Sequence, residues 1–244
     1  MKALLLENIH PRAYDAFHRG GATIASAVGA MDDDELIEAL QGVELLGIRS
    51  RTQITRRVLA NAPDLLAIGA FCIGTNQIDM QAASLKGVAV FNAPYSNTRS
   101  VAELVIAEII FLVRRVYPKV VRAHAGGWEK SADHAREVRG KKLGIIGFGN
   151  IGSQVSTLAE AMGMDVYYYD TIDKLSIGNA TRLGSVDEVL QIADIVTVHV
   201  DGNPSNKNII SERALSLMKP GACLLNLSRG HVVDIDALAA ALDF

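Results

Sequence analysis

The residues 147–152, Gly-Phe-Gly-Asn-Ile-Gly, have types and spacing suited to holding a phosphate group. They follow the apolar run 143–146 and open a segment with helical spacing at Ile151. In such a turn Gly147 permits the tight bend, Gly149 lets the backbone approach a pyrophosphate, and Gly152 allows close packing of helix and strand. The N-terminus of the helix offers free N–H groups to the phosphates. The pattern predicts a dinucleotide-binding loop, with Asn150 and Ile151 among its residues.

Asp170 occupies the position at which a dinucleotide-binding fold commonly has an acidic residue for the ribose of the cofactor. Asp170 ends the next apolar run, 166–169, at the spacing expected after Gly152. Its oxygens can accept hydrogen bonds from ribose hydroxyls, and its charge would repel a 2′-phosphate. No arginine follows Asp170 immediately, although Lys174 is near. We therefore expect NAD rather than NADP. The glycine pattern alone, outside this setting, would be an incidental turn.

Around these residues, short apolar runs alternate with segments of helical spacing along the chain. Such alternation predicts βαβ units and parallel sheets. Strands are expected at 3–6, 23–25, 43–48, 65–68 and 88–91, with helices at 14–18, 33–40, 56–60 and 79–85. A second series has strands at 143–147, 165–169, 195–199 and 223–227, with helices at 151–162, 186–193, 212–217 and 236–242. Helix caps are expected at Asp32 or Asp33 and at Thr55. We predict two α/β domains, 1–97 and 98–244.

A strongly apolar helix is expected between the two series, over residues 99–116. Asn92-Ala93-Pro94 ends the first series, and Gly126-Gly127 breaks the pattern further on. The helix is apolar on nearly all sides, which is typical of a helix buried between domains or against a second subunit. We therefore expect a homo-oligomer that forms through this helix.

The composition argues against several classes of partner. The 244 residues are 49% hydrophobic and carry a net charge of −3, so no basic field attracts nucleic acid or a membrane surface. The longest apolar stretch, 101–113, contains two glutamates and is shorter than the ~20 residues of a membrane span. The N-terminal apolar run is too short for a signal peptide. Cys72 and Cys223 are expected to be buried thiols, and no metal site is predicted. We expect a cytoplasmic protein with a small-molecule substrate.

Several motifs, taken in order, resemble the D-isomer-specific 2-hydroxyacid dehydrogenases. Residues 71–76 (Phe-Cys-Ile-Gly-Thr-Asn) with Asp79, and 91–94 (Phe-Asn-Ala-Pro) with 96–103, are similar to loops of the phosphoglycerate branch. Residues 47–52 (Gly-Ile-Arg-Ser-Arg-Thr) point to the same branch, and 226–230 (Asn-Leu-Ser-Arg-Gly) match the whole family. The resemblance covers essentially the whole chain. It implies a flavodoxin-like substrate domain followed by a doubly wound (Rossmann) NAD-binding domain that is incomplete at its C-terminus.

The resemblance also implies roles for particular residues. Arg229 would hold the substrate carboxylate and polarise the carbonyl through a bidentate contact. Gly74 would present backbone N–H groups to the carboxylate. Arg49 and Arg51, with Ser50, would bind a substrate phosphate; without the resemblance, the two arginines could equally belong to a solvated strand end. The other implied positions are Asn97 for the substrate and Ser100, Val101 and His199 for the cofactor.

The reaction that the resemblance implies is the NAD-dependent oxidation of 3-phosphoglycerate to 3-phosphohydroxypyruvate, which opens L-serine biosynthesis. The family also needs a histidine as general acid/base, held by a glutamate, C-terminal to Arg229. The sequence ends at Phe244 before either position, and His199 and His231 lack an evident acidic partner. We therefore expect a truncated chain that is inactive alone. Two alternatives stay open: a non-catalytic, dimerising NAD-binding module, and a gene fragment without function.

Overall fold

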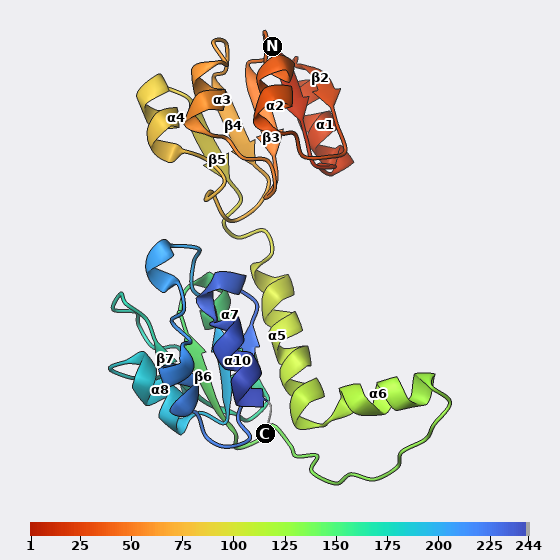
Figure 1. Ribbon diagram of the computed structural model, residues 1–244, viewed down its shortest axis with the longest axis vertical. Coiled ribbons are helices and arrows are strands. Elements are labelled where there is room, and N and C mark those ends of the chain that lie inside the picture. The colour runs from red at the N-terminus through yellow and green to blue at the C-terminus, as the bar shows by residue number, and fades with distance from the viewer. Residues whose placement is uncertain (243–244) are drawn as a thin grey trace. The chain divides into compact units, whose positions relative to one another are not determined.

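The computed structural model describes residues 1–242 and divides the chain into two compact units, Met1–Ser96 and Asn97–Phe244 (Figure 1). Each unit is built on a five-stranded sheet in which every strand pair is parallel. The α/β class predicted from the alternation of apolar runs is confirmed. Among residues 1–242, no helix combines the length and the apolar character that crossing a bilayer requires.

The first unit has the strand order β2-β1-β3-β4-β5, the order of flavodoxin-like sheets. Its strands are β1 (Lys2–Leu5), β2 (Thr23–Ser26), β3 (Leu45–Ile48), β4 (Ala67–Ala70) and β5 (Ala89–Asn92). Its helices are α1 (Pro11–Arg19), α2 (Asp33–Ala39), α3 (Arg56–Ala60) and α4 (Met80–Lys86). One apolar core joins strands β1, β3 and β4 to the inner faces of α2, α3 and α4.

Local hydrogen bonds explain where the helices of this unit begin. Asp32 caps α2, and Glu35 closes a capping box by accepting the N–H of Asp32. Thr55 caps α3 by accepting the N–H of Val58. The predicted caps at Asp32 and Thr55 are therefore confirmed, and Asp32 rather than Asp33 is the cap of α2.

The second unit has the strand order β10-β9-β6-β7-β8. Its strands are β6 (Lys142–Ile146), β7 (Asp165–Tyr169), β8 (Thr181–Arg182), β9 (Ile195–Val198) and β10 (Cys223–Asn226). Its helices are α5 (Thr98–Val113), α6 (Val116–His124), α7 (Asn150–Ala161), α8 (Val186–Ile192), α9 (Glu212–Ser216) and α10 (Ile235–Leu242), with 3-10 turns η1 (Pro204–Asn206) and η2 (Gly230–Val232). Strand β8 was not predicted, because two exposed residues carry no readable alternation.

Two apolar cores cover the two faces of the second sheet. Leu143 and Ile145 of β6 point to one face, where α5 and α7 pack. Ile146 of the same strand points to the other face, where α8 and α9 pack with β9. Because successive residues of a strand face opposite sides, a strand buried on both faces reads as one continuous apolar run. The run at residues 143–146 is explained by this arrangement.

The apolar segment before the second sheet differs from its prediction. One helix was expected over 99–116, but α5 ends at Val113, Arg115 takes a left-handed conformation (φ 52°), and α6 follows. Within the chain, α5 buries one face, whose residues are Thr98, Ala102, Val105 and Ile109. The side chain of Leu104 is 50% exposed and that of Phe111 46%. Within the chain, α5 packs on its own unit with one stripe only. The expected burial of its other faces, between domains or against a second subunit, stays a prediction.

The two cysteines are free thiols, as expected, but both are half-buried rather than fully buried. Cys223 lies in β10, and burial raises the pKa of its thiol. Cys72 follows β4, and its Sγ lies 3.2 Å from the carbonyl oxygen of Gly74. The burial of Cys72 is limited because it belongs to a loop at the end of the sheet.

Candidate functional site

The glycine-rich loop lies at the carboxyl end of β6, where the strand order reverses. Strand β7 pairs with β6 on one side and β9 on the other, and open α/β sheets bind ligands at such a point. Gly147 has φ 94°, a conformation that favours glycine, and its N–H donates to the carbonyl oxygen of Tyr169 (2.9 Å). A Cβ at Gly147 would lie 2.6 Å from the carbonyl oxygen of His199. The loop is therefore held between the ends of β7 and β9.

The other two glycines of the motif keep a cradle open at the start of α7. A Cβ at Gly152 would lie 2.2 Å from the carbonyl oxygen of Gly147, so only glycine allows this approach of helix and loop. A Cβ at Gly149 would meet nothing within 4 Å. Gly149 is the N-cap of α7 and has no side chain, so no side chain caps the first N–H groups of this helix. This geometry fits a bound pyrophosphate.

Asp170 fastens the glycine-rich loop to the end of β7. Its Oδ2 accepts the N–H of Phe148 (2.8 Å), and its Oδ1 accepts the N–H of Ile172 (2.9 Å). Each carboxylate oxygen has a second lone pair, so the predicted contact with a ribose hydroxyl remains geometrically available. Arg182, the cationic side chain beside this turn, forms an ion pair with Asp173 (3.0 Å). Asp170 therefore has a structural role that its position in the sequence did not indicate.

An aromatic pair beneath the loop was also missed by the sequence analysis. The rings of Phe148 and Tyr168 stack with their centroids 3.8 Å apart, and both side chains are buried. The Tyr168 hydroxyl donates to the carbonyl oxygen of Lys174 (2.7 Å) and lies 3.2 Å from Ser176 Oγ. One buried tyrosine thus supports both the glycine-rich loop and the segment after Asp170. Position 168 alternates with 166 in a strand, and this was the available signal for its burial.

His199 follows β9 next to Gly147. Its Nε2 lies 2.9 Å from Thr197 Oγ1, and its Nδ1 is buried without a hydrogen-bond partner among residues 1–242. Burial lowers the pKa of His199 from 6.5 to about 4. The imidazole is therefore neutral at physiological pH, which suits a residue beside a cofactor better than a protonated general acid.

The burial of His199 predicts a pH-dependent stability. Between pH 6.5 and about 4, the unfolded chain binds a proton at this residue that the folded chain does not. The contribution of His199 to the free energy of unfolding is therefore fully present above pH 6.5. It is lost as the pH falls toward 4, by on the order of 3 kcal/mol. We expect His199→Gln, which retains a hydrogen bond to Thr197, to flatten this part of the pH profile. Urea unfolding of both proteins at several pH values checks this, and parallel profiles would contradict it.

Arg229 lies at the carboxyl end of β10, the strand beside β9. Asn226 shapes the turn that carries it: Asn226 Oδ1 accepts the N–H of Ser228 (3.1 Å), and Asn226 Nδ2 donates to the carbonyl oxygen of Arg229 (2.8 Å). The Arg229 side chain is exposed, and its Nη1 donates to the carbonyl oxygen of the adjacent Ser228 (3.0 Å). The guanidinium is therefore available at the edge of the sheet where Gly147 and His199 also lie.

In the first unit, the predicted phosphate-binding residues form an exposed loop after β3. The side chains of Arg49, Ser50 and Arg51 are all exposed. Beneath them lies Glu7, which follows β1 and is 7% exposed. Its Oε1 accepts the N–H groups of Arg49 (3.1 Å) and Thr52 (2.9 Å), and its Oε2 accepts that of Arg51 (3.0 Å). Glu7 was not predicted from the sequence, although an acid directly after the first expected strand was an available signal.

A buried glutamine joins this loop to the one that carries Gly74. Gln77 is 3% exposed, and its Nε2 donates to the carbonyl oxygens of Arg49 (2.8 Å) and Gly74 (3.2 Å). Strands β3 and β4 are neighbours in the sheet, so their carboxyl ends, and hence both loops, lie at one edge. The structure thus brings Arg49, Ser50, Arg51 and Gly74 together within the first unit.

The remaining predicted residues, Asn97, Ser100 and Val101, lie at the start of α5 in the second unit. Asn97 is the N-cap but makes no side-chain capping hydrogen bond. Ser100 is exposed, whereas Val101 is half-buried against the core that includes α7. Among residues 1–242, the polar side-chain groups of Asn97 and Ser100 therefore have no hydrogen-bond partner.

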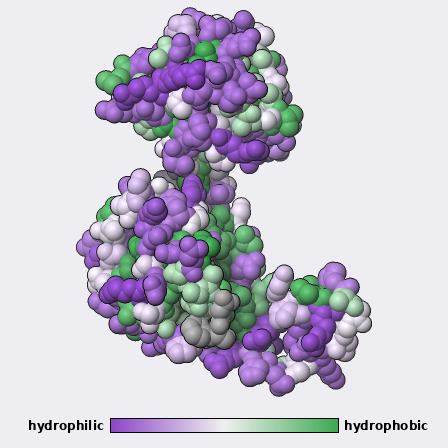
Figure 2. Space-filling view, in the orientation of Figure 1, coloured by the Kyte–Doolittle hydropathy of each residue, from purple (hydrophilic) through white to green (hydrophobic). Residues whose placement is uncertain are grey.

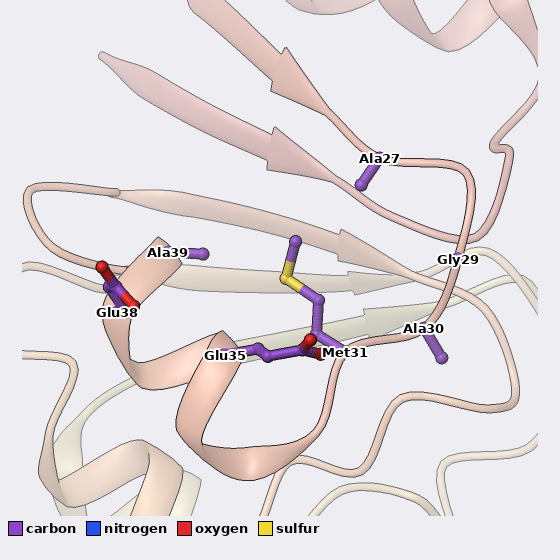
Figure 3. A pocket seen from close by; sticks show the side chains of 7 residues that line it. All are labelled: Ala27, Gly29, Ala30, Met31, Glu35, Glu38 and Ala39. Atoms are coloured by element: carbon purple, nitrogen blue, oxygen red, sulfur yellow. The ribbon is translucent and has the colours of Figure 1, made fainter.

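A cavity of about 490 Å³ in the first unit is lined by none of the predicted site residues (Figure 3). Its lining residues are Ala27, Gly29, Ala30, Met31, Glu35, Glu38 and Ala39. The Met31 side chain extends into this space, between the end of β2 and α2 (Figure 3). The charged groups here are carboxylates, and one of them, Glu35, is engaged in the capping box of α2. This cavity is therefore unsuited to an anionic substrate.

Comparison with known proteins connects this arrangement to one family. Residues 106–244 match the model of the NAD-binding domain of D-isomer specific 2-hydroxyacid dehydrogenases. The D-3-phosphoglycerate dehydrogenase of Haemophilus influenzae is 51% identical over 243 residues, which are 99% of this chain and 59% of the relative. This chain therefore spans about three fifths of the length of that relative.

Solved structures give the same result. A Thermus thermophilus protein named TT0316 has a TM-score of 0.91 at 29% identity, over 99% of this chain and 78% of the other. The D-lactate dehydrogenase of Aquifex aeolicus, solved with NAD and lactic acid, has a TM-score of 0.84 at 28% identity, over 98% and 72%. Together with the glycine-rich loop, the family match supports the prediction of NAD as the cofactor.

Proposed function

Because the chain belongs to the D-isomer specific 2-hydroxyacid dehydrogenase family, we propose that the protein oxidises 3-phosphoglycerate to 3-phosphohydroxypyruvate with NAD. The reaction is the first step of L-serine biosynthesis. The D-3-phosphoglycerate dehydrogenase of Haemophilus influenzae, 51% identical, supports the choice of substrate. The residues that would carry this function belong to two sets, one in each unit.

The choice of a phosphorylated substrate rests on the two exposed arginines of the loop after β3. Arg49 and Arg51 flank Ser50, and all three are exposed. The exposed Arg56 and Arg57 nearby are paired with acids, whereas neither Arg49 nor Arg51 is in an ion pair among residues 1–242. Two unpaired guanidinium groups beside a hydroxyl suit a dianionic phosphate.

When bound, NAD would supply the carbon that accepts a hydride from C2 of the substrate. The loop 147–152 and the first turn of α7 bind the pyrophosphate through backbone N–H groups. Asp170 would accept hydrogen bonds from the ribose, and we assign neutral His199, with Ser100 and Val101, to the nicotinamide half. The glycine-rich loop determines the position of the cofactor because its backbone is already held by Asp170 and Tyr169.

In the second unit we assign the substrate carboxylate to Arg229, with Asn97 as a further polar contact. In the first unit we assign a role in substrate binding to the backbone N–H groups at Gly74. A bidentate guanidinium orients the acid and stabilises negative charge that develops on the C2 oxygen. The proton of the 2-hydroxyl must pass to a base. Among residues 1–242 no histidine forms an ion pair or hydrogen bond with a carboxylate, so the proton transfer is assigned to none of these histidines.

The choice of substrate is tested by comparing 3-phosphoglycerate with D-glycerate, which lacks the phosphate. We expect Arg49→Ala and Arg51→Ala each to weaken binding of 3-phosphoglycerate by at least ~10-fold, because each removes a charge-assisted contact. Binding of D-glycerate should change little. Calorimetric titration of the full chain measures both ligands.

A matched control is Arg57→Ala, which removes an exposed arginine of the same unit that is paired with Asp34. It should leave the affinity for both ligands unchanged. A wild-type protein that ignores the phosphorylated acid and reduces glyoxylate or pyruvate instead would refute the choice of substrate. In the full-length protein, tight NADH binding without any turnover would favour a binding module over an enzyme.

We further propose that the protein self-associates through the exposed face of α5 and α6. Figure 2 shows hydrophobic side chains along the side of the second unit that α5 forms. The exposed apolar residues of the two helices are Leu104, Phe111, Leu112, Tyr117, Val120 and Val121. Exposed apolar side chains gathered on neighbouring helices are typical of protein–protein interfaces. A second copy of the chain is the occupant that we assign to this face.

Charge placed on this face should dissociate the assembly. We expect the double variant Leu104→Glu, Phe111→Glu to sediment as a monomer where the wild type sediments as an oligomer, because buried unpaired carboxylates are strongly unfavourable. The control is Val28→Glu in the first unit, which alters an equally apolar residue that is 80% exposed. A monomeric wild type, or an assembly that persists in the double variant, would contradict the proposal.

A further inference from the structure

The carboxylate of Glu7 has contacts that suit the support of a binding loop better than the general stabilisation of a fold. It is 7% exposed and accepts hydrogen bonds from the peptide N–H groups of Arg49, Arg51 and Thr52. These donors lie 42 to 45 positions away along the chain, in one four-residue segment. Three donors that converge on one carboxylate force the backbone to wrap around it. The Arg49 and Arg51 side chains are then exposed, away from the buried acid.

The backbone around Glu7 is specialised for this contact. Glu7 has φ 60° and Asn8 has φ 52°, both in the left-handed region that non-glycine residues seldom adopt. The Glu7 N–H donates to the carbonyl oxygen of Gly29 (3.2 Å), which fixes the bend after β1. An unfavourable conformation of this kind persists only where surrounding contacts impose it, and it is common at functional sites.

The ionisation of Glu7 agrees with its contacts. Burial by itself raises the pKa of the carboxyl, but the hydrogen bonds from Thr52, Arg51 and Arg49 outweigh burial and lower the pKa below its usual value. Glu7 therefore stays ionised at neutral pH. Hydrogen bonds to an ionised acceptor are stronger than those between neutral groups, so the loop is held firmly.

Gln77 completes the support from the other side of the same loop. It donates to the carbonyl oxygen of Arg49, and Glu7 accepts the N–H of Arg49. Both backbone polar groups of Arg49 are therefore hydrogen-bonded to buried side chains. Gln77 also donates to the carbonyl oxygen of Gly74. The segment 49–52 is thus fixed relative to the loop that carries Gly74.

We propose that Glu7 is the positioning residue of the substrate-phosphate loop, holding the backbone of Arg49, Arg51 and Thr52 so that both guanidinium groups meet one phosphate. The inference rests on the proposed function, because it takes the phosphate as the ligand of these arginines. Glu7 itself touches no substrate. Its effect should therefore be on the recognition of the phosphate rather than on the cofactor or on the carboxylate of the substrate.

The test uses Glu7→Gln in the full chain, with 3-phosphoglycerate, D-glycerate and NADH as probes. Glutamine has the same shape, but its NH₂ group would face peptide donors, so at least one of the three contacts is lost. We expect the affinity for 3-phosphoglycerate to fall ~10-fold or more, and those for D-glycerate and NADH to change less than ~2-fold. The control is Glu35→Gln, since Glu35 also accepts a peptide N–H in this unit but lies at the start of α2.

Hydrogen exchange of the free protein tests the support of the loop without any ligand. In Glu7→Gln, the amides of Arg49, Arg51 and Thr52 should exchange faster, while those of α2 should not. If Glu7→Gln does not fold, Glu7→Asp keeps the charge on a shorter side chain and should shift both measurements in the same direction.

Each outcome is decisive. An unchanged preference for the phosphorylated ligand in a folded variant overturns the inference, and so does an equal loss of all three ligands, which would mark a purely structural role. Failure of both variants to fold would overturn it as well. If the wild type does not distinguish 3-phosphoglycerate from D-glycerate, the proposed substrate is wrong, and faster exchange at 49–52 would then show only that Glu7 holds the loop.

Discussion

Replacing Gly152 by valine should abolish NAD binding and destabilise the second unit. A Cβ at this position would lie 2.2 Å from the carbonyl oxygen of Gly147 and 3.1 Å from Ile145 Cγ2, so α7 must move away from the loop. Overpacking of this kind costs about 1–3 kcal/mol or more. Displacement of α7 also removes the N–H groups that face the pyrophosphate. We expect the affinity for NADH to fall by at least ~100-fold, with a lower unfolding midpoint, measured by fluorescence titration and thermal denaturation.

Gly149→Ala separates these two effects. A Cβ at Gly149 would meet nothing within 4 Å, and the backbone there has φ −83°, which alanine adopts readily. The unfolding midpoint should therefore stay near that of the wild type. NADH binding should still weaken, because the added methyl group occupies the space through which the backbone approaches the pyrophosphate. If Gly149→Ala binds NADH normally, or if Gly152→Val melts as the wild type does, the loop does not hold the cofactor as we propose.

Arg229→Gln should remove nearly all turnover and leave the fold intact. The Arg229 side chain is exposed, and its Nη1 donates to the carbonyl oxygen of adjacent Ser228, so its loss breaks no contact between elements of residues 1–242. In the proposed reaction, the guanidinium binds the substrate carboxylate and stabilises charge on the C2 oxygen. Removing one such stabilising group lowers kcat by about 10²–10³-fold. Steady-state kinetics of the full-length protein, run beside thermal unfolding, measure the two properties separately.

Arg229→Lys is the informative companion variant. Lysine keeps the positive charge but cannot make a bidentate contact with a carboxylate. We expect it to restore part of the affinity for the substrate and little of kcat. A full recovery of turnover would mean that Arg229 acts as a point charge only. Wild-type turnover in Arg229→Gln would show that another residue binds the carboxylate.

The secondary structure was largely predictable because its signals are local. The expected helix 56–60 and strand 165–169 have the same bounds as α3 and β7. Apolar runs of the right length mark strands wherever both faces of a parallel sheet are covered, as β6 illustrates. Strand β8 was missed because two exposed residues that pair with Tyr167 and Tyr168 have no pattern of their own.

The long apolar helix shows that composition alone does not predict which side chains a chain buries by itself. Its residues predicted burial between domains or against a second subunit, and within the chain α5 buries one stripe and ends at Val113, before Arg114 and Arg115. Hydrophobic side chains make the burial of a surface favourable, but they do not determine which other surface covers it. The left-handed conformation at Arg115 had no sequence signal, since glycine or asparagine is the usual residue there.

The parallel α/β architecture, the glycine-rich loop and the preference for NAD follow from the amino-acid sequence, because each depends on residues adjacent or regularly spaced along the chain. The residues that support the predicted binding positions become apparent in the folded chain. Asp170 holds the loop at Phe148, Tyr168 stacks beneath it, and Glu7 holds a loop more than forty positions away. Buried polar groups must find hydrogen-bond partners, and those partners come from whichever strand ends the sheet order brings together. That order is a property of the folded chain, so no local sequence pattern predicts which residues will be these hydrogen-bond partners.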